Sequence, residues 1–273
     1  MRHVIHYSIS EVVPYVNWAY FFHAWQMAGK PQSEQDALRG DAERLLDHWK
    51  DNYHTHAVIG IYPAGSDSDD IVVEGIRLPM LRQQIPDKER GVCLCLADFV
   101  RPLSPKPLDK VGVFAVTIDS IVETLYVDDP YLRMLAQTLA DRLAEASAEL
   151  LHLQVRTRIW GYAPDEKLDI EQLHAEAFQG IRPAVGYPSL PDTSLNFLLD
   201  QLIDMGEIGI RLTENGAMRP HASVSGLMLQ HPAARYFYLG KIGEDQWADY
   251  ARRRGIPLEM ARKFLASNMI KTN

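Results

Sequence analysis

Residues 179–188 bring together a cation, two prolines, a glycine and an aromatic side chain. The prolines fix their own φ angles and bias the preceding residues toward extended conformations, so the segment is stiff. Arg182 carries a fork of donors suited to a carboxylate or a phosphate, Tyr187 offers a flat face with a polar tip, and Gly186 lets backbone approach a ligand. The segment is therefore a candidate binding loop, although a surface turn with a solvated arginine fits the same composition.

Three carboxylates could serve such a loop. Glu145 and Glu149 lie four residues apart in a predicted helix, where a solvated acidic face paired with Arg142 explains both. Glu176 precedes Arg182 by six residues and could orient its guanidinium from behind, but a plain glutamate on a helix surface fits equally well. No side chain near the loop is an evident general base, which argues against an ordinary free-standing methyltransferase.

Two patterns have some features of metal sites. The acidic turn that contains Asp67, Asp69 and Asp70 lacks the downstream glycine and glutamate of a calcium loop. His54 and His56 supply half of a zinc site, but no third ligand lies nearby in the sequence. We therefore predict an ordinary turn and solvated histidines, with no bound metal.

Composition limits the class of protein. The 273 residues are 47% hydrophobic, which is enough for a sizeable core. A net charge of −8 and a pI near 5.7 argue against a nucleic-acid partner. Cys93 and Cys95 would share one side of a strand, so buried thiols in a reducing cytoplasm are the simplest interpretation. No apolar run reaches the roughly 18 residues of a membrane span, so we expect a soluble protein without a membrane partner.

Hydrophobic periodicity predicts an α+β fold, in which helices flank a twisted antiparallel or mixed sheet. No boundary divides the chain, so one domain over residues 1–273 is expected, and no Gly-x-Gly-x-x-Gly supports a Rossmann-type methyltransferase. Helices are expected over residues 18–29, 41–53, 130–160, 170–178, 194–205, 244–255 and 258–265. A short strand or turn is expected over residues 4–14. Strands are expected over residues 57–62, 70–74, 91–100, 110–118, 224–230 and 236–239, and those at residues 57–62 and 70–74 should form a hairpin.

Motifs spread over most of the chain occur in the order found in one family. They include Trp-Gly-Tyr-Ala-Pro at residues 160–164, the loop at residues 179–188 and His-Ala-Ser-Val-Ser-Gly at residues 221–226. Together they resemble the C-terminal activation domain of cobalamin-dependent methionine synthase. That family binds S-adenosylmethionine through an Arg-x-x-x-Gly-Tyr-Pro loop, which matches residues 182–188 here.

The resemblance implies a set of site residues. Asn17 stands where the family usually has an aspartate, and its amide can form hydrogen bonds but gives no charge to a ligand ammonium. The family's ligand-contacting glutamate matches Glu145, whereas Glu149 is expected to be structural. The full set implied to bind S-adenosylmethionine is Asn17, Glu145, Arg182, Ala184, Gly186, Tyr187, Tyr236 and Phe237, with Glu176 supporting Arg182 from behind.

The resemblance also implies a function. In the family this domain reactivates enzyme whose cobalt has been oxidised to cob(II)alamin, by coupling an electron from flavodoxin to methyl transfer from S-adenosylmethionine. The chain lacks the Asp-x-His-x-x-Gly motif that ligates cobalamin, so we expect either that a partner module on another chain holds that cofactor or that this chain is an excised piece of a longer protein. The chain would then be a part or subunit of a methyltransferase and not a complete enzyme. Two alternatives remain: an S-adenosylmethionine-binding regulatory module, and an activation subunit for another corrinoid methyltransferase.

Overall fold

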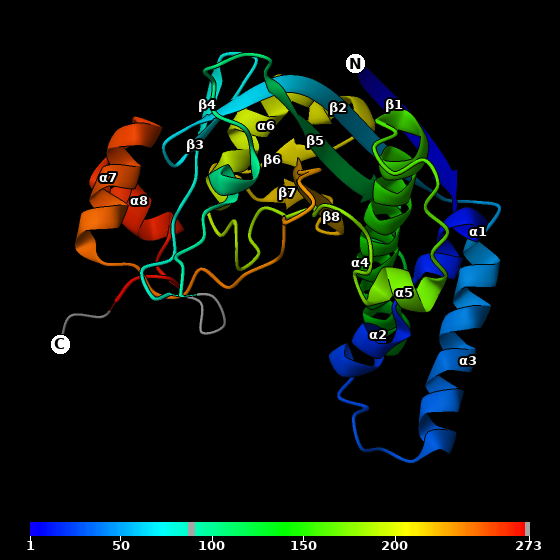
Figure 1. Ribbon diagram of the computed structural model, residues 1–273. Coiled ribbons are helices and arrows are strands. Elements are labelled where there is room, and N and C mark those ends of the chain that lie inside the picture. Colours follow the sequence, from blue (N-terminus) through cyan, green and yellow to red (C-terminus); the bar gives the residue numbers. More distant parts are fainter. Residues whose placement is uncertain (87–90, 271–273) are drawn as a thin grey trace.

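A curled antiparallel sheet forms the centre of the molecule (Figure 1). The computed structural model describes residues 1–86 and 91–270. The strand order is β4-β3-β2-β5-β8, and β1 pairs with the first part of β2 beside β3. These strands are β1 (Arg2–Ser8), β2 (His54–Asp67), β3 (Asp70–Val73), β4 (Ile76–Pro79), β5 (Asp109–Ile118) and β8 (Ser223–Met228), and a separate small hairpin joins β6 (Arg211–Leu212) to β7 (Met218–Arg219).

Both faces of the sheet are buried. Along β5, Phe114 and Val116 pack into one apolar core, while Val113 and Ala115 pack into the other. Strand β5 therefore appears in the sequence as a nearly continuous apolar run without polar alternation. The long helix α4 (Pro130–Gln154) covers the first face, and α6 (Asn196–Ile203) covers the second.

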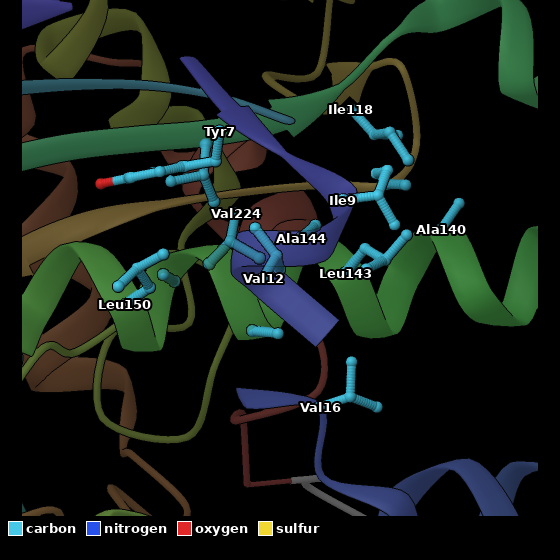
Figure 2. Packing of buried hydrophobic residues seen from close by; sticks show 14 of the residues in the cluster. Tyr7, Ile9, Val12, Val16, Ile118, Ala140, Leu143, Ala144, Leu150 and Val224 are labelled. Atoms are coloured by element: carbon cyan, nitrogen blue, oxygen red, sulfur yellow. The ribbon is translucent and has the colours of Figure 1, made fainter. Parts of the chain in front are cut away.

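Helix α4 is the main support of the site. Its start is fixed by Asp129, whose carboxylate accepts hydrogen bonds from the backbone nitrogens of Tyr131 and Leu132, each at 3.0 Å. A π-helical turn, Val155–Ile159, continues the helix toward Trp160, so the prediction of one long helix is confirmed. Figure 2 shows side chains of α4 packed beneath the N-terminal strand and α1 (Ile9–Val12).

The remaining helices agree with the expected α+β class. Several boundaries differ. The helix expected over residues 41–53 is α3 (Gln32–Trp49), which begins directly after Pro31. The helices expected over residues 18–29 and 170–178 end at Ala24 and His174. The other α-helices are α2 (Trp18–Ala24), α5 (Ile170–His174), α7 (Glu244–Arg254) and α8 (Leu258–Phe264). Short 3₁₀ helices cover Val13–Tyr15, Leu96–Phe99, Ser120–Thr124, Thr193–Leu195 and Met205–Ile208.

Two predicted strands are wrong. Residues 91–100 contain a 3₁₀ helix, because the carboxylate of Asp98 accepts a hydrogen bond from the backbone nitrogen of Cys95 at 2.9 Å and closes a tight turn. Residues 236–239 form no strand, because their backbone groups bond to loops: the nitrogen of Leu239 donates to the carbonyl of Pro188 at 3.1 Å, and Gln83 Nε2 donates to the carbonyl of Tyr238 at 2.9 Å. Leu96, Phe99 and Leu239 in these segments are buried although no strand ladder holds them.

The predicted hairpin of residues 57–62 and 70–74 is present, but its first strand continues through Pro63 to Asp67. The acidic residues at this turn pair with arginines: Asp67 and Asp70 with Arg77 at 2.8 and 2.7 Å, and Asp69 with Arg82 at 2.6 Å. The turn thus helps to attach the C-terminal helices, because Asp70 also pairs with Arg253 of α7.

The histidine and cysteine patterns have separate structural explanations. His56 Nε2 lies 2.9 Å from a carboxylate oxygen of Asp119, and its Nδ1 lies 2.7 Å from Nδ1 of His6. Both cysteines have free thiols, but only Cys95 is fully buried, whereas Cys93 is half-buried. Within residues 1–86 and 91–270, none of the helices has the length and apolar character needed to cross a membrane.

Candidate functional site

A cavity of about 680 Å³ lies on the α4 side of the sheet, between α4, the start of α2, and two loops. Three widely separated parts of the chain meet there: residues 142–149, residues 182–189 and residues 236–238. Of the residues singled out from the sequence, those that line this cavity are Asn17, Glu145, Glu176, Arg182, Ala184, Tyr187, Tyr236 and Phe237. Gly186 is not among the lining residues.

The loop at residues 181–185 runs along the outer edge of β8. Ile181 exchanges two backbone hydrogen bonds with Leu229, each of 2.9 Å. The nitrogen of Leu227 donates to the carbonyl of Pro183 at 3.0 Å, and the nitrogen of Val185 donates to the carbonyl of Ser225 at 2.8 Å. Because side chains alternate along an extended segment, Ile181 and Val185 enter the core while Arg182 and Ala184 face the cavity.

Two glycines have different roles in this arrangement. Gly186 has φ of +90°, and its nitrogen donates to the carbonyl of Leu190 at 2.8 Å, so it shapes the turn after the loop. Gly226 of β8 allows the backbone of the loop to lie close against the strand. A Cβ atom there would lie 2.2 Å from the carbonyl oxygen of Pro183 and 2.9 Å from Cα of Ala184.

The guanidinium of Arg182 is held at the back of the cavity. Its Nη2 donates to Oε2 of Glu149 at 2.7 Å, and its Nη1 lies 3.5 Å from Nδ1 of His152. The backbone nitrogen of Arg182 donates to the hydroxyl of Tyr236 at 3.0 Å. Burial lowers the pKa of Arg182, but Glu149, Tyr236 and Glu145 together outweigh that effect and the net pKa is raised. With 18% of its side chain exposed, Arg182 stays charged and faces open space.

The interpretation of Glu149 as part of a solvated acidic face is wrong. The residue is only 6% exposed, lines the cavity and pairs with Arg182. It shares a face of α4 with Arg142, Glu145 and Ala146 because residues three, four and seven positions apart align on a helix. That spacing was visible in the sequence, but the partner 33 residues away was not.

His152 extends the contacts of Arg182 on the side away from the cavity. Burial lowers its pKa well below the ordinary value, and the cations of Arg156 and Arg182 lower it further, so the ring is neutral. Its Nε2 lies 3.3 Å from the hydroxyl of Tyr162, which donates to the carbonyl of Gln179 at 3.4 Å. A single tautomer, protonated on Nε2, satisfies these contacts and leaves Nδ1 to accept from Arg182.

Three polar residues complete the walls. Glu145 accepts a hydrogen bond from the hydroxyl of Tyr187, whose pKa is raised by burial and then by the Glu145 charge. The Oδ1 atom of Asn17 caps α2 by accepting from the nitrogen of Ala19 at 3.1 Å. Glu176 has a left-handed backbone with φ of 56°, and burial raises its pKa while Arg182 lowers it. Among the described residues, no hydrogen bond joins Glu176 to Arg182, and Glu149 takes that place.

Aromatic residues surround the opening. The side chains of Tyr20, Tyr187 and Tyr238 are exposed around it, while Tyr236, Phe237 and Phe114 lie deeper. The cavity thus combines a guanidinium for a carboxylate, carboxylates for cations or hydroxyls, and flat apolar faces for a ring system. Its one lining histidine, His174, has Nε2 3.2 Å from the carbonyl of Tyr15, so that ring bonds to backbone. The arrangement is that of a binding site.

The chain is similar to known proteins in both sequence and structure. A family model described as "Vitamin B12 dependent methionine synthase, activation domain" matches residues 8–255. Among solved structures, the chain is similar to one described as "Crystal Structure of the MetH Reactivation Domain bound to AdoHcy". The two are 36% identical in sequence with a TM-score of 0.93, and the match covers 100% of this chain and 91% of the other.

Proposed function

Since the chain belongs to the family of activation domains of vitamin B12-dependent methionine synthase, we propose that its cavity binds S-adenosylmethionine and that it supports reactivation of that enzyme. The observation that carries this proposal is Arg182, a charged guanidinium fixed by Glu149 and His152 at the wall of a 680 Å³ cavity. A guanidinium held in this way is suited to the carboxylate of an amino acid. The similar solved structure, bound to AdoHcy, supports the same class of ligand.

Each of the other lining residues contacts a particular part of S-adenosylmethionine in this proposal. Arg182 binds the α-carboxylate, and Glu145 accepts from ribose hydroxyls once Tyr187 gives up its hydrogen bond. Tyr236 and Phe237 give the adenosine apolar faces, and the backbone around Ala184 follows the extended ligand. Asn17 adds a neutral polar contact through its amide, because its Oδ1 already caps α2. Glu176 also lines the cavity and contributes negative charge near Arg182.

The chemistry at the sulfonium needs alignment and no proton transfer from this chain. Cobalamin held by the partner module would accept the methyl group after a flavodoxin-like donor had reduced its cobalt by one electron, and the sulfur would keep the bonding electron pair as S-adenosylhomocysteine forms. The cobalamin belongs to a partner module of methionine synthase. This chain's residues hold the ligand so that its methyl group points toward the opening, and orientation alone contributes several kcal/mol.

Calorimetric titration of S-adenosylmethionine into the purified chain tests the proposal directly. The unaltered chain should bind saturably, and Arg182→Ala should weaken binding about 10-fold or more, because it removes a charged clamp. Arg44→Ala is the matched control: that side chain is 74% exposed and pairs only within α3. Absence of binding by the unaltered chain would refute the proposal.

Reactivation is tested separately with the cobalamin-binding module of methionine synthase, reduced flavodoxin and S-adenosylmethionine labelled on its methyl group. Label should reach cobalamin with the unaltered chain, and much more slowly with Arg182→Ala at subsaturating ligand. Ligand binding without any methyl transfer or association with the module would instead favour the regulatory alternative.

A further inference from the structure

One carboxylate oxygen of Glu149 lacks a hydrogen-bond partner within residues 1–86 and 91–270. Its Oε2 accepts from Arg182 at 2.7 Å, but among the described residues its Oε1 has no hydrogen-bond partner although the atom is buried. A carboxylate has about four lone-pair sites, so a single hydrogen bond leaves most of its capacity unused. A buried polar atom without a partner costs free energy, and here it belongs to a side chain that lines the cavity.

The ligand carries an α-ammonium that could pair with this oxygen of Glu149. An α-amino acid carries its ammonium and its carboxylate on the same carbon atom, so a carboxylate bound at Arg182 brings the ammonium beside it. Asn17 supplies no charge to this ammonium, and its Oδ1 is already engaged by Ala19 at 3.1 Å. The ammonium therefore needs a carboxylate close to Arg182.

Three carboxylates line the cavity, and their contacts differ. Glu145 accepts from the hydroxyl of Tyr187 and lies one turn of α4 away from Glu149. Glu176 is exposed to solvent and has no hydrogen bond to Arg182 among the described residues. Only Glu149 combines deep burial, direct contact with Arg182 and a free oxygen.

We propose that Glu149 receives the α-ammonium of the ligand, so that Arg182 and Glu149 together bind the amino-acid end of the molecule. This inference rests on the proposed function, because it takes the ligand to be an S-adenosyl amino acid. The ion pair between the two residues then serves twice: it orients the guanidinium, and it sets a negative charge where the ligand is positive. Asn17 offers the ammonium no negative charge, and Glu149 on α4 supplies that charge.

The experiment compares two ligands by calorimetry: S-adenosylhomocysteine, and the analogue whose α-amino group is replaced by hydrogen. Both keep the carboxylate for Arg182, and only the first has the ammonium. In Glu149→Gln the affinity for S-adenosylhomocysteine should fall about 10- to 100-fold. The affinity for the deaminated analogue should fall much less. Glu43→Gln, a change at a side chain that is 54% exposed, is the matched surface control.

The remaining outcomes each contradict the proposal. Equal losses for both ligands would mean that Glu149 acts only by holding Arg182. A loss confined to S-adenosylhomocysteine in Glu176→Gln, and absent in Glu149→Gln, would assign the ammonium to Glu176. If the unaltered chain binds neither ligand, the proposed function itself fails, which is a distinct result.

A second variant covers the case in which Glu149→Gln does not fold. Asn17→Asp keeps a good helix cap and adds a carboxylate at the cavity. The quantity to compare is the affinity for S-adenosylhomocysteine divided by the affinity for the deaminated analogue. If Glu149 already pairs with the ammonium, Asn17→Asp should change this ratio less than about threefold. An increase of about 10-fold or more in that ratio would show that the ammonium was unpaired and would overturn the proposal.

Discussion

The hydroxyl of Tyr236 accepts a hydrogen bond from the backbone nitrogen of Arg182 at 3.0 Å, and so joins two segments 54 residues apart in the sequence. The bond fixes the loop at the residue whose side chain faces the cavity. It also explains why residues 236–239 can be irregular: their position is set by side-chain and loop contacts in place of a strand ladder.

Tyr236→Phe should lower the free energy of unfolding by about 1 kcal/mol, because the nitrogen of Arg182 loses its acceptor. S-Adenosylhomocysteine should also bind more weakly, since Arg182 is less firmly placed. Urea denaturation and calorimetry measure the two effects. Tyr238→Phe, at a residue that is 64% exposed, is the control and should change stability by less than about 0.5 kcal/mol. Equal stability of both variants would show that the hydroxyl of Tyr236 does not hold the loop.

Gly226→Ala should separate the loop from β8. The added Cβ would lie 2.2 Å from the carbonyl oxygen of Pro183, and backbone cannot move as easily as a flexible side chain. We expect a loss of about 1–3 kcal/mol in stability together with weaker ligand binding. Thermal denaturation and titration of S-adenosylhomocysteine provide the measurements.

The control for this change is Gly40→Ala within α3. The nearest atom to a Cβ there is Nη1 of Arg44 at 3.5 Å, so the methyl group fits. Because alanine favours helix over glycine, this variant should gain about 0.5–1 kcal/mol. If Gly226→Ala were as stable as the unaltered chain, the tight packing of the loop on β8 would be disproved.

His152 should make stability depend on pH below neutrality. Its pKa in the folded chain is held well below 6.5, so the unfolded chain binds a proton there that the folded chain does not. The stabilisation is complete above about pH 6.5 and falls as the pH decreases toward the folded pKa, by about 1.4 kcal/mol at pH 5.5. In His152→Gln this component is absent. The stability difference between the two proteins, from urea unfolding, should therefore shrink by that amount between pH 8 and 5.5. A constant difference would mean that the pKa of His152 is the same in the folded and unfolded chains.

Much of the fold follows from local sequence signals. Asp129 and Pro130 mark the start of α4, and its apolar residues repeat with helical spacing, so this element was predicted nearly to its end. The apolar segment at residues 91–100 carries no such local signal. Its turn depends on Asp98, which also bonds to Arg82, 16 residues earlier in the chain. Strand propensity alone could not reveal that partner.

The site was predictable in its types of residue and less so in its pairings. The composition of residues 179–188 predicted a binding loop, and the family resemblance identified other residues that also line the cavity. Glu149 was assigned a structural role because a glutamate on a helix usually faces water. Its burial follows from Arg182 and His152, and these contacts exist only once the loop lies against β8. Gly226 was missed for the same reason, since its absent side chain matters only through the loop that crosses it.

The position of the loop along β8 has a consequence for solubility. A sheet edge with unpaired backbone groups can recruit a strand from another molecule, and folded proteins protect such edges. Here the segment that presents Arg182 to the ligand also occupies the hydrogen-bonding groups of Ser225, Leu227 and Leu229. Any change that detaches the loop therefore exposes the unpaired backbone groups of β8 and also disrupts the cavity. Loss of binding and aggregation should appear together in such variants, and bound ligand should protect the chain from both.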